Sequence, residues 1–183
     1  MTEQAIATIP FAIPPLVDVQ TEREITQLLY IEAELLDQTR YQEWYDTVFA
    51  EDLEYIAPTR STRERKPGGS EYHVESYHFR DLHSTLALRV NRMYTGHAWA
   101  EDPASRTRRL VTNIRIEDRG DGKFLVKSYL LLYRSQWGTS SYDLIVAERY
   151  DTLSKASGQW RISRREVYLT HTVLGTPNLG VFL

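Results

Sequence analysis

Apolar residues in the first third of the chain recur at helical spacing. After Thr21 they follow an i, i+3, i+4, i+7 pattern, while the charged residues of the segment fall largely on the other side. The apolar set is Ile25, Leu28, Leu29, Ala33, Leu35 and Leu36, and the charged set is Glu22, Arg23, Glu24, Glu32 and Glu34. Thr21 and Glu24 fit a capping box. After a break at residues 37–39 the spacing returns in Tyr41, Trp44, Tyr45, Val48 and Phe49. The pattern predicts a long helix followed by a short one.

The middle of the chain changes character twice. The stretch "LEYIAP" predicts a short strand that ends at Pro58, and the polar stretch "TRSTRERKPGGS" predicts a loop. We expect residues 77–94 to form a helix, because apolar side chains fall roughly on one stripe of it. These side chains are Leu82, Leu86, Val90 and Met93.

The second half of the chain predicts four long antiparallel strands. Residues 109–116 alternate in polarity, and the Asp121-Gly122 dipeptide after them is a hairpin signal. The strand expected at residues 124–134, "FLVKSYLLLYR", is apolar enough to be buried on much of both faces. Residues 142–153 and the stretch "WRISRREVYL" predict the last two strands. The apolar tail "HTVLGTPNLGVFL" is expected to dock onto the domain.

Helices followed by a run of strands predict an α+β fold. A strongly curved sheet folded over the N-terminal helices would form a cone with an internal pocket. Residues 1–20, interrupted by Pro10, Pro14 and Pro15, predict an extended N-terminal arm. Residues 21–183 are then a single domain, which the chain length allows.

Composition narrows the possible chemistry. The sequence has no cysteine, which excludes disulfides, thiolate zinc sites, cysteine nucleophiles and a self-contained iron–sulfur cluster. A formal net charge of −3 gives no general bias towards nucleic acid. The sequence has no apolar window long enough to span a membrane and no signal-peptide pattern at its start, so we expect a cytoplasmic protein.

Several separated motifs resemble one protein family. The stretch "YIEAELLDQTRYQEWYDTVFAEDLEYIAP" (Tyr30–Pro58) is similar to the opening of NTF2-like, SnoaL-like cone domains. More narrowly, it resembles the small (beta) subunit of aromatic-ring-hydroxylating Rieske non-haem iron dioxygenases of the biphenyl and benzene dioxygenase type. The stretches "WAEDPASRTRRLVTNI", "FLVKSYLLLYRSQ", "AERYDTL" and "WRISRREVYLTHTVL" continue the resemblance in order, over residues 22–183. The chain departs from the pattern in the loop at residues 60–76 and in the N-terminal arm.

The resemblance implies a larger alpha subunit as partner, which carries a Rieske [2Fe-2S] cluster and a mononuclear Fe(II). It also implies an α3β3 hexamer that adds both atoms of O2 to an aromatic ring, with NAD(P)H electrons arriving through a reductase and often a ferredoxin. In this family the beta chain is structural and holds no cofactor or catalytic residue. The resemblance leaves the aromatic substrate open.

Cone folds also host free-standing enzymes, so catalysis by this chain itself is an alternative. An isomerase or dehydratase would use interior acid–base groups, and the candidates are Asp37, Tyr41, Tyr45, Asp52, Tyr55 and His97. Against this, Tyr41 and Tyr45 lie on the apolar stripe and Asp37 suits a helix end. His73, His78 and His83 are spaced by five residues, which puts no neighbouring pair of them on one face of a helix or strand. His97 and His171 are far apart in the sequence. We therefore expect no metal site. A small-ligand-binding module remains a further alternative.

The stretch "WAEDPASRTRRLVTNIRI" concentrates four arginines, which nearby acids bracket. A nucleic-acid patch would need uncompensated charge, and an anion pocket is a further alternative. Arginine's planar group suits carboxylates at interfaces, so we interpret the cluster as ion pairing within the chain or between subunits. The candidate subunit-contact residues are Trp99, Arg106, Arg108, Arg109, Arg115 and Phe182.

Overall fold

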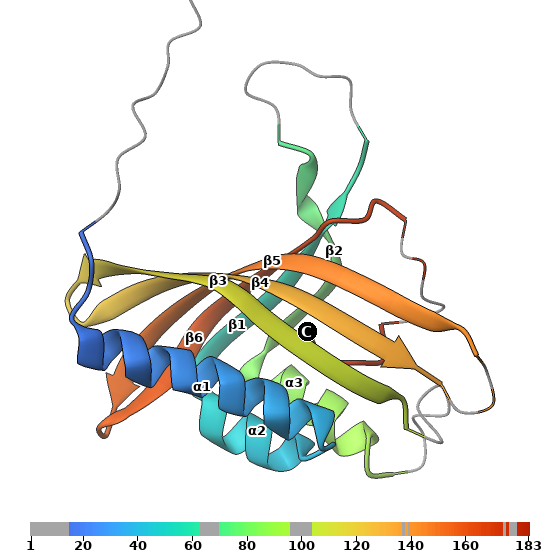
Figure 1. Cartoon of the computed structure of the whole chain (residues 1–183), viewed down its shortest axis with the longest axis horizontal. Coiled ribbons are helices and arrows are strands. Elements are labelled where there is room, and N and C mark those ends of the chain that lie inside the picture. Colours follow the sequence, from blue (N-terminus) through green and yellow to red (C-terminus); the bar gives the residue numbers. More distant parts are fainter. Residues whose placement is uncertain are drawn as a thin grey trace, which may run out of the picture.

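The computed structural model describes residues 15–62, 70–95, 104–136, 138, 140–173, 175 and 179–183. Among these residues two helices, two strands and a third helix come first, and four strands follow, as Figure 1 shows. In the described residues the helices are α1 (Val19–Asp37), α2 (Tyr41–Val48) and α3 (His83–Arg92). The strands are β1 (Phe49–Arg60), β2 (Tyr72–Leu82), β3 (Arg106–Gly120), β4 (Lys123–Ser135), β5 (Tyr142–Ala156) and β6 (Gln159–Leu169).

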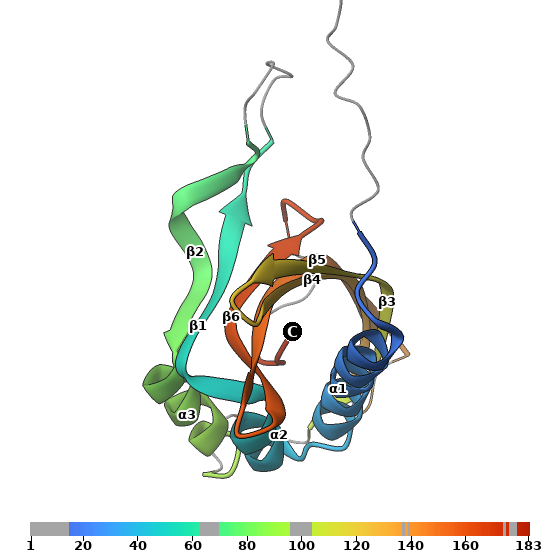
Figure 2. The same ribbon diagram turned by 90° about the vertical axis from the view of Figure 1, so that its left-hand side faces the viewer.

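The described strands form one six-stranded sheet in the order β2-β1-β6-β5-β4-β3. Neighbouring strands are antiparallel except β1 and β6, which pair in parallel and join the two halves of the chain. The sheet curves over α1 and α2, and the last residues of the sequence lie inside the curve (Figure 2). The predicted α+β cone is the observed architecture.

The predicted first helix is present, with an earlier start. Asp18 is its N-cap and accepts a hydrogen bond of 2.9 Å from the backbone N–H of Thr21, so the predicted capping box is not used. The buried face of α1 packs into the core. One residue of this face, Glu32, is charged. Helix α2 adds Trp44, whose ring packs edge-on against Phe49 at 4.9 Å.

The prediction of a helix at residues 77–94 is wrong for the first third of that range. Residues up to Leu82 belong to β2, and only His83–Arg92 is helical. Phe79 in β2 pairs with Ala57 of β1, and its ring packs against the buried Tyr55 at 4.9 Å. This long-range pairing overrides the local helical spacing.

Strand β1 is longer than predicted, because it continues through Pro58. The β1–β2 register shifts on either side of this proline. A proline lacks the N–H that a ladder needs, and such irregularities are where strands tolerate it.

The four predicted strands of the second half are present as β3 to β6. On β4 the inward side chains are buried, including Val126, Leu130 and Leu132. The alternate side chains Tyr129, Leu131 and Tyr133 are exposed. Within this chain β4 is therefore buried on one face, against the expectation of burial on much of both.

The end of the predicted tail docks as expected, whereas its described residues 171–173 and 175 are exposed. Val181, Phe182 and Leu183 are buried in the core. Among the described residues, no helix combines the length and the apolar character that crossing a lipid bilayer requires.

Candidate functional site

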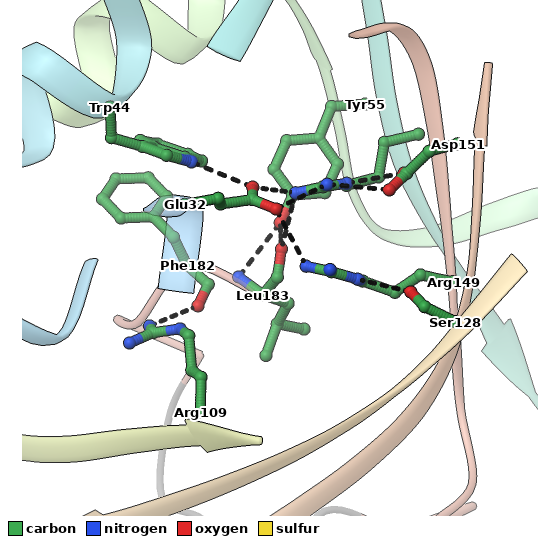
Figure 3. Close-up of polar contacts among 10 residues, drawn as sticks. Glu32, Trp44, Tyr55, Arg109, Ser128, Arg149, Asp151, Phe182 and Leu183 are labelled. Carbon is green, nitrogen blue, oxygen red and sulfur yellow. Dashed lines mark hydrogen bonds and ion pairs between the residues drawn. The ribbon is translucent and has the colours of Figure 1, made fainter. Parts of the chain in front are cut away.

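A buried carboxylate, that of Glu32, lies at the centre of the cone (Figure 3). Only 1% of this residue is exposed, because its position on α1 faces inward. The indole N–H of Trp44 donates to its Oε1 at 3.0 Å. Arg165 donates to both carboxylate oxygens, at 2.9 Å to Oε2, and Arg149 approaches Oε2 at 3.3 Å. Helix α1 is thus joined to β5 and β6 through one side chain.

Arg165 connects this carboxylate to a second one. Its Nε and Nη2 donate to the two oxygens of Asp151 at 2.7 and 2.9 Å. Arg149 also donates to the hydroxyl of Ser128 on β4, at 3.4 Å. We call Glu32, Ser128, Arg149, Asp151 and Arg165 the buried network. It contains two arginines and two carboxylates, so its formal charges cancel.

The electrostatics of the buried network fix its protonation. Burial opposes ionisation of Glu32, but the charges of Arg165 and Arg149 outweigh burial and lower its pKa to about 2. Burial likewise opposes the charge of Arg165, whereas Asp151 and Glu32 hold its pKa well above the usual value. Burial, together with the like charge of Arg165, lowers the pKa of Arg149. At neutral pH Glu32 is an ionised, arginine-bound carboxylate, which makes it a weak base.

The last residues of the sequence fill the space beside this network. The Tyr55 hydroxyl donates to the backbone oxygen of Leu183 and accepts from its N–H at 3.0 Å. Arg109 donates to the backbone oxygen of Phe182 at 2.6 Å. The Phe182 ring packs against Trp44, with a centroid separation of 4.7 Å. The interior of the cone is therefore occupied by this chain's own side chains.

The residues considered for acid–base catalysis make structural contacts. Asp37 accepts hydrogen bonds from the Thr107 hydroxyl and the Arg109 backbone N–H, both at 2.9 Å, and pairs with the Arg109 guanidinium at 2.5 Å. It joins the end of α1 to β3. The Tyr41 ring packs against Phe182 at 5.4 Å.

The remaining catalytic candidates do not converge. The Tyr45 hydroxyl lies 2.7 Å from His83 Nδ1, on the α2–α3 side of the fold. Tyr55 is bound to the tail as described above, Asp52 is exposed, and His97 lies outside the described residues. Acid–base catalysis needs a group with a transferable proton that faces space for a substrate. This arrangement instead fixes helices and strands relative to one another.

The histidines that are candidate metal ligands either contact other side chains or are exposed. His73 Nε2 lies 3.0 Å from the hydroxyl of Ser61, His83 contacts Tyr45, and His171 is exposed. Within the described ranges no three His, Asp or Glu side chains are grouped in a way that would hold a metal ion. A Rieske cluster needs cysteine ligands, and the sequence contains none.

The candidate subunit-contact residues fall into two groups. Arg106, Arg108 and Arg115 are exposed on β3. Arg109 and Phe182 are buried and contact each other within the chain. Trp99 lies outside the described residues. Contact of these residues with another subunit stays a prediction.

The sequence pattern does not predict the buried network, because it places Glu32 on the charged side of its helix. A usable signal is present in β5. Its inward positions are Ile145, Ala147, Arg149, Asp151 and Leu153, so the two charged residues share the face of three apolar ones. Charges at apolar positions of an alternating strand indicate a paired interior cluster.

Comparison with known proteins agrees with the fold and the motifs. The ring hydroxylating beta subunit family matches residues 31–176. The beta subunit of biphenyl 2,3-dioxygenase from Rhodococcus jostii (strain RHA1) is 32% identical over 174 residues, which cover 92% of each chain.

Two solved structures have folds similar to that of this chain. A naphthalene 1,2-dioxygenase structure with indole in its active site matches with a TM-score of 0.80 and 26% identity, covering 92% of this chain and 88% of that one. An NTF2-like protein with a cystatin-like fold from Novosphingobium aromaticivorans matches with a TM-score of 0.56 and 16% identity, covering 87% and 86%. The predicted NTF2-like fold and the family resemblance are both confirmed: the chain belongs to the ring-hydroxylating beta subunit family, the small subunits of aromatic-ring dioxygenases.

Proposed function

We propose that this chain is the non-catalytic, structural subunit of a terminal oxygenase and stabilises an α3β3 hexamer. Family membership supports the partner, an alpha subunit. The observation that carries the structural role is the cone interior. There Phe182 and Leu183 are buried beside a network of ion pairs, where a cone enzyme would hold its substrate. An interior filled by the chain's own side chains and by paired charges suits a rigid support.

The chemistry then belongs to the partner. The alpha subunit would carry the Rieske [2Fe-2S] cluster and the mononuclear Fe(II), with NAD(P)H electrons supplied by a reductase and often a ferredoxin. The aromatic compound would be bound there and converted to a cis-dihydrodiol. We propose a cytoplasmic location, where NAD(P)H is available. A fixed ring geometry matters because electrons in this family pass between the metal centres of neighbouring alpha subunits, and a bound beta trimer stabilises that ring.

The test is co-expression of this chain with the open reading frames that neighbour its gene, followed by sizing and a visible spectrum. The expected result is a complex of about 200 kDa, roughly three such chains and three larger ones, with Rieske-type absorbance. The alpha subunit expressed alone serves as the control, and it should lose assembly or activity that this chain restores. A stable colourless assembly that never recruits an iron protein would reject the proposal in favour of a free-standing isomerase, dehydratase or ligand-binding module.

A further inference from the structure

Two cations lie opposite each other on the outer face of the sheet, the face that points away from the helices. Arg115 on β3 is the direct antiparallel partner of Lys127 on β4. Lys127 alternates with the buried Val126 and Ser128, so its side chain lies on the outer face. Like charges directly opposite each other on neighbouring strands destabilise the pairing. The pair is therefore unfavourable unless a negative charge lies close to both side chains.

Within the described residues, no carboxylate of this chain forms an ion pair with either cation. The Lys127 ammonium instead lies over the ring of Tyr150, 5.1 Å from its centroid. Acids on the neighbouring parts of β3, β5 and β6 have other partners. Glu117 pairs with Arg119 at 3.3 Å, Glu148 accepts a hydrogen bond of 2.9 Å from the Tyr150 hydroxyl, and Glu166 pairs with Arg164 at 2.7 Å.

A bulge in β3 lies directly beside the two cations. Between two pairs of the ladder, β3 has two residues, Asn113 and Ile114, where β4 has only Ser128. The backbone of Asn113 is in the left-handed region, with a φ of 53°. An extra residue of this kind disrupts the ladder locally and leaves backbone polar groups unpaired by it. The bulge borders a cavity of about 290 Å³, which is lined by Asn113, Ile114, Arg115, Lys127 and Tyr129.

The lining of this cavity is rich in hydrogen-bond donors. Arg115 brings a guanidinium and Lys127 an ammonium, and both are donors without any acceptor atom. The Asn113 amide and the Tyr129 hydroxyl add neutral donors. Backbone N–H groups at a left-handed residue are a further common element of anion-binding concavities. Two positive charges match a doubly charged anion, and a phosphate group carries about −1.5 to −2 charges at pH 7.

We propose that this cavity binds a doubly charged oxyanion, either the phosphate ion or the phosphate group of a small molecule. The anion lies between Arg115 and Lys127, so two attractive contacts replace their repulsion. Asn113 and Tyr129 orient the anion by hydrogen bonds. The site consists of residues of one chain, and it does not depend on the proposed function.

The first test is calorimetric titration of the full-length chain with inorganic phosphate. The wild type should bind one phosphate, and Arg115→Gln or Lys127→Gln should weaken binding at least about tenfold, because each removes a charge-assisted contact. Arg106→Gln and Lys123→Gln are the matched controls. These residues are exposed on the same two strands outside the cavity, and their replacement should leave the affinity within about twofold of wild type.

Thermal unfolding supplies a readout that a merely structural pair of cations would not change. At a phosphate concentration 100 times Kd, the Tm of the wild type should exceed its Tm in chloride of equal ionic strength by about 5–10 °C. Lys127→Gln should lose this gain. In chloride the same variant should be about as stable as wild type, because the substitution also removes the repulsion from Arg115.

Titration with phenyl phosphate distinguishes the two sources of the anion. Tighter binding than that of inorganic phosphate would assign the site to an organic phosphate, since Ile114 and Tyr129 line the same cavity. Equal affinity would assign it to the phosphate ion. The proposal is overturned if phosphate and chloride give the same Tm, or if the two cavity variants bind phosphate as wild type does. Either of those results would leave the proposed role in the oxygenase unchanged.

Discussion

Each face of the sheet carries residues that depart from the usual distribution. The inner face of β4 and β5 buries Arg134, Arg149 and Asp151, whereas the outer face of the same strands exposes Leu131 and Leu144. In most proteins charged residues are exposed and large apolar residues are buried. The inner charges are tolerable because each is paired or hydrogen-bonded, and the outer apolar residues are consistent with a surface that another protein covers.

This difference shows which face of the sheet fixes the orientation of α1. Replacing a complete buried ion-pair set with apolar residues is often neutral or stabilising, so the buried network is not a large source of stability in itself. Removing one member leaves an uncompensated charge, and that is costly. The inner face therefore specifies how α1 lies against the sheet, and the outer face leaves apolar side chains exposed.

The largest effect is expected from Arg165→Met. It leaves Glu32 and Asp151 buried and lacking their main partner, and the free energy of unfolding should fall by about 3–5 kcal/mol. The neighbouring Arg164→Met is the control. Arg164 is part-exposed on the outer side and pairs with Glu54 and Glu166, so its loss should cost about 0–1 kcal/mol. Urea unfolding measures both, and equal losses would contradict the distinction between the two faces.

A second comparison uses adjacent leucines on β4. Leu130 is buried on the inner face, and Leu130→Ala should lower the free energy of unfolding by about 3 kcal/mol through lost burial and a cavity. Leu131 faces outward, and Leu131→Ala should cost less than about 1 kcal/mol in the isolated monomer. Denaturant midpoints at low protein concentration separate the two. A larger loss for Leu131 would mean that the outer face is covered within the chain.

The pH dependence of stability should reveal Glu32. Because its pKa is lowered from 4.5 to about 2 on folding, its contribution is complete above pH 4.5 and is lost as the pH falls through about 2. The loss amounts to up to about 3 kcal/mol over that window. Glu32→Gln should lower stability at neutral pH and flatten the acid limb of the unfolding curve. A variant with the wild-type slope between pH 4.5 and 2 would show that Glu32 does not titrate in this way.

The smallest expected effect on stability is at the bulge of β3, where the register shifts between Thr112 and Arg115. Asn113 has a φ of 53°, in the left-handed region, and Asn113→Ala should cost about 1 kcal/mol of stability because alanine tolerates that region poorly. Asn113→Gly, which suits the same φ, is the control and should stay within about 0.5 kcal/mol of wild type. Thermal unfolding measures both. Equal behaviour of the two variants would indicate that the bulge relaxes.

The sequence predicted the elements whose signal is local. Helical spacing located α1 and α2, and alternation located β3 to β6. The strand β2 was missed because its pairing with β1 is a long-range contact, while the neighbouring residues of α3 supply a helical stripe. The parallel pairing of β1 with β6 is likewise absent from any local pattern.

The candidate site was predicted less well for a related reason. The arginines of β3 are the most prominent charged cluster of the sequence, because they lie close together in the chain. Arg149 and Arg165 are dispersed, and their partner Glu32 lies on a distant helix, so only the fold brings them together. Of the clustered arginines, Arg109 pairs with Asp37 inside the chain. The arginines that lie close together in the sequence are therefore not those that meet in the buried network of the folded chain.

The pairing of Glu32 with Arg165 has a consequence for synthesis of the protein. The two residues are separated by 133 positions, so the glutamate of α1 emerges from the ribosome long before its arginine. Until β6 is made, the growing chain carries this carboxylate without its main partner, at a position that must become buried, while its apolar strands are already present. Partly synthesised strands of this kind are prone to aggregate. The cone closes only after β6 has been made, when this strand delivers the arginine that binds both oxygens of the helix carboxylate.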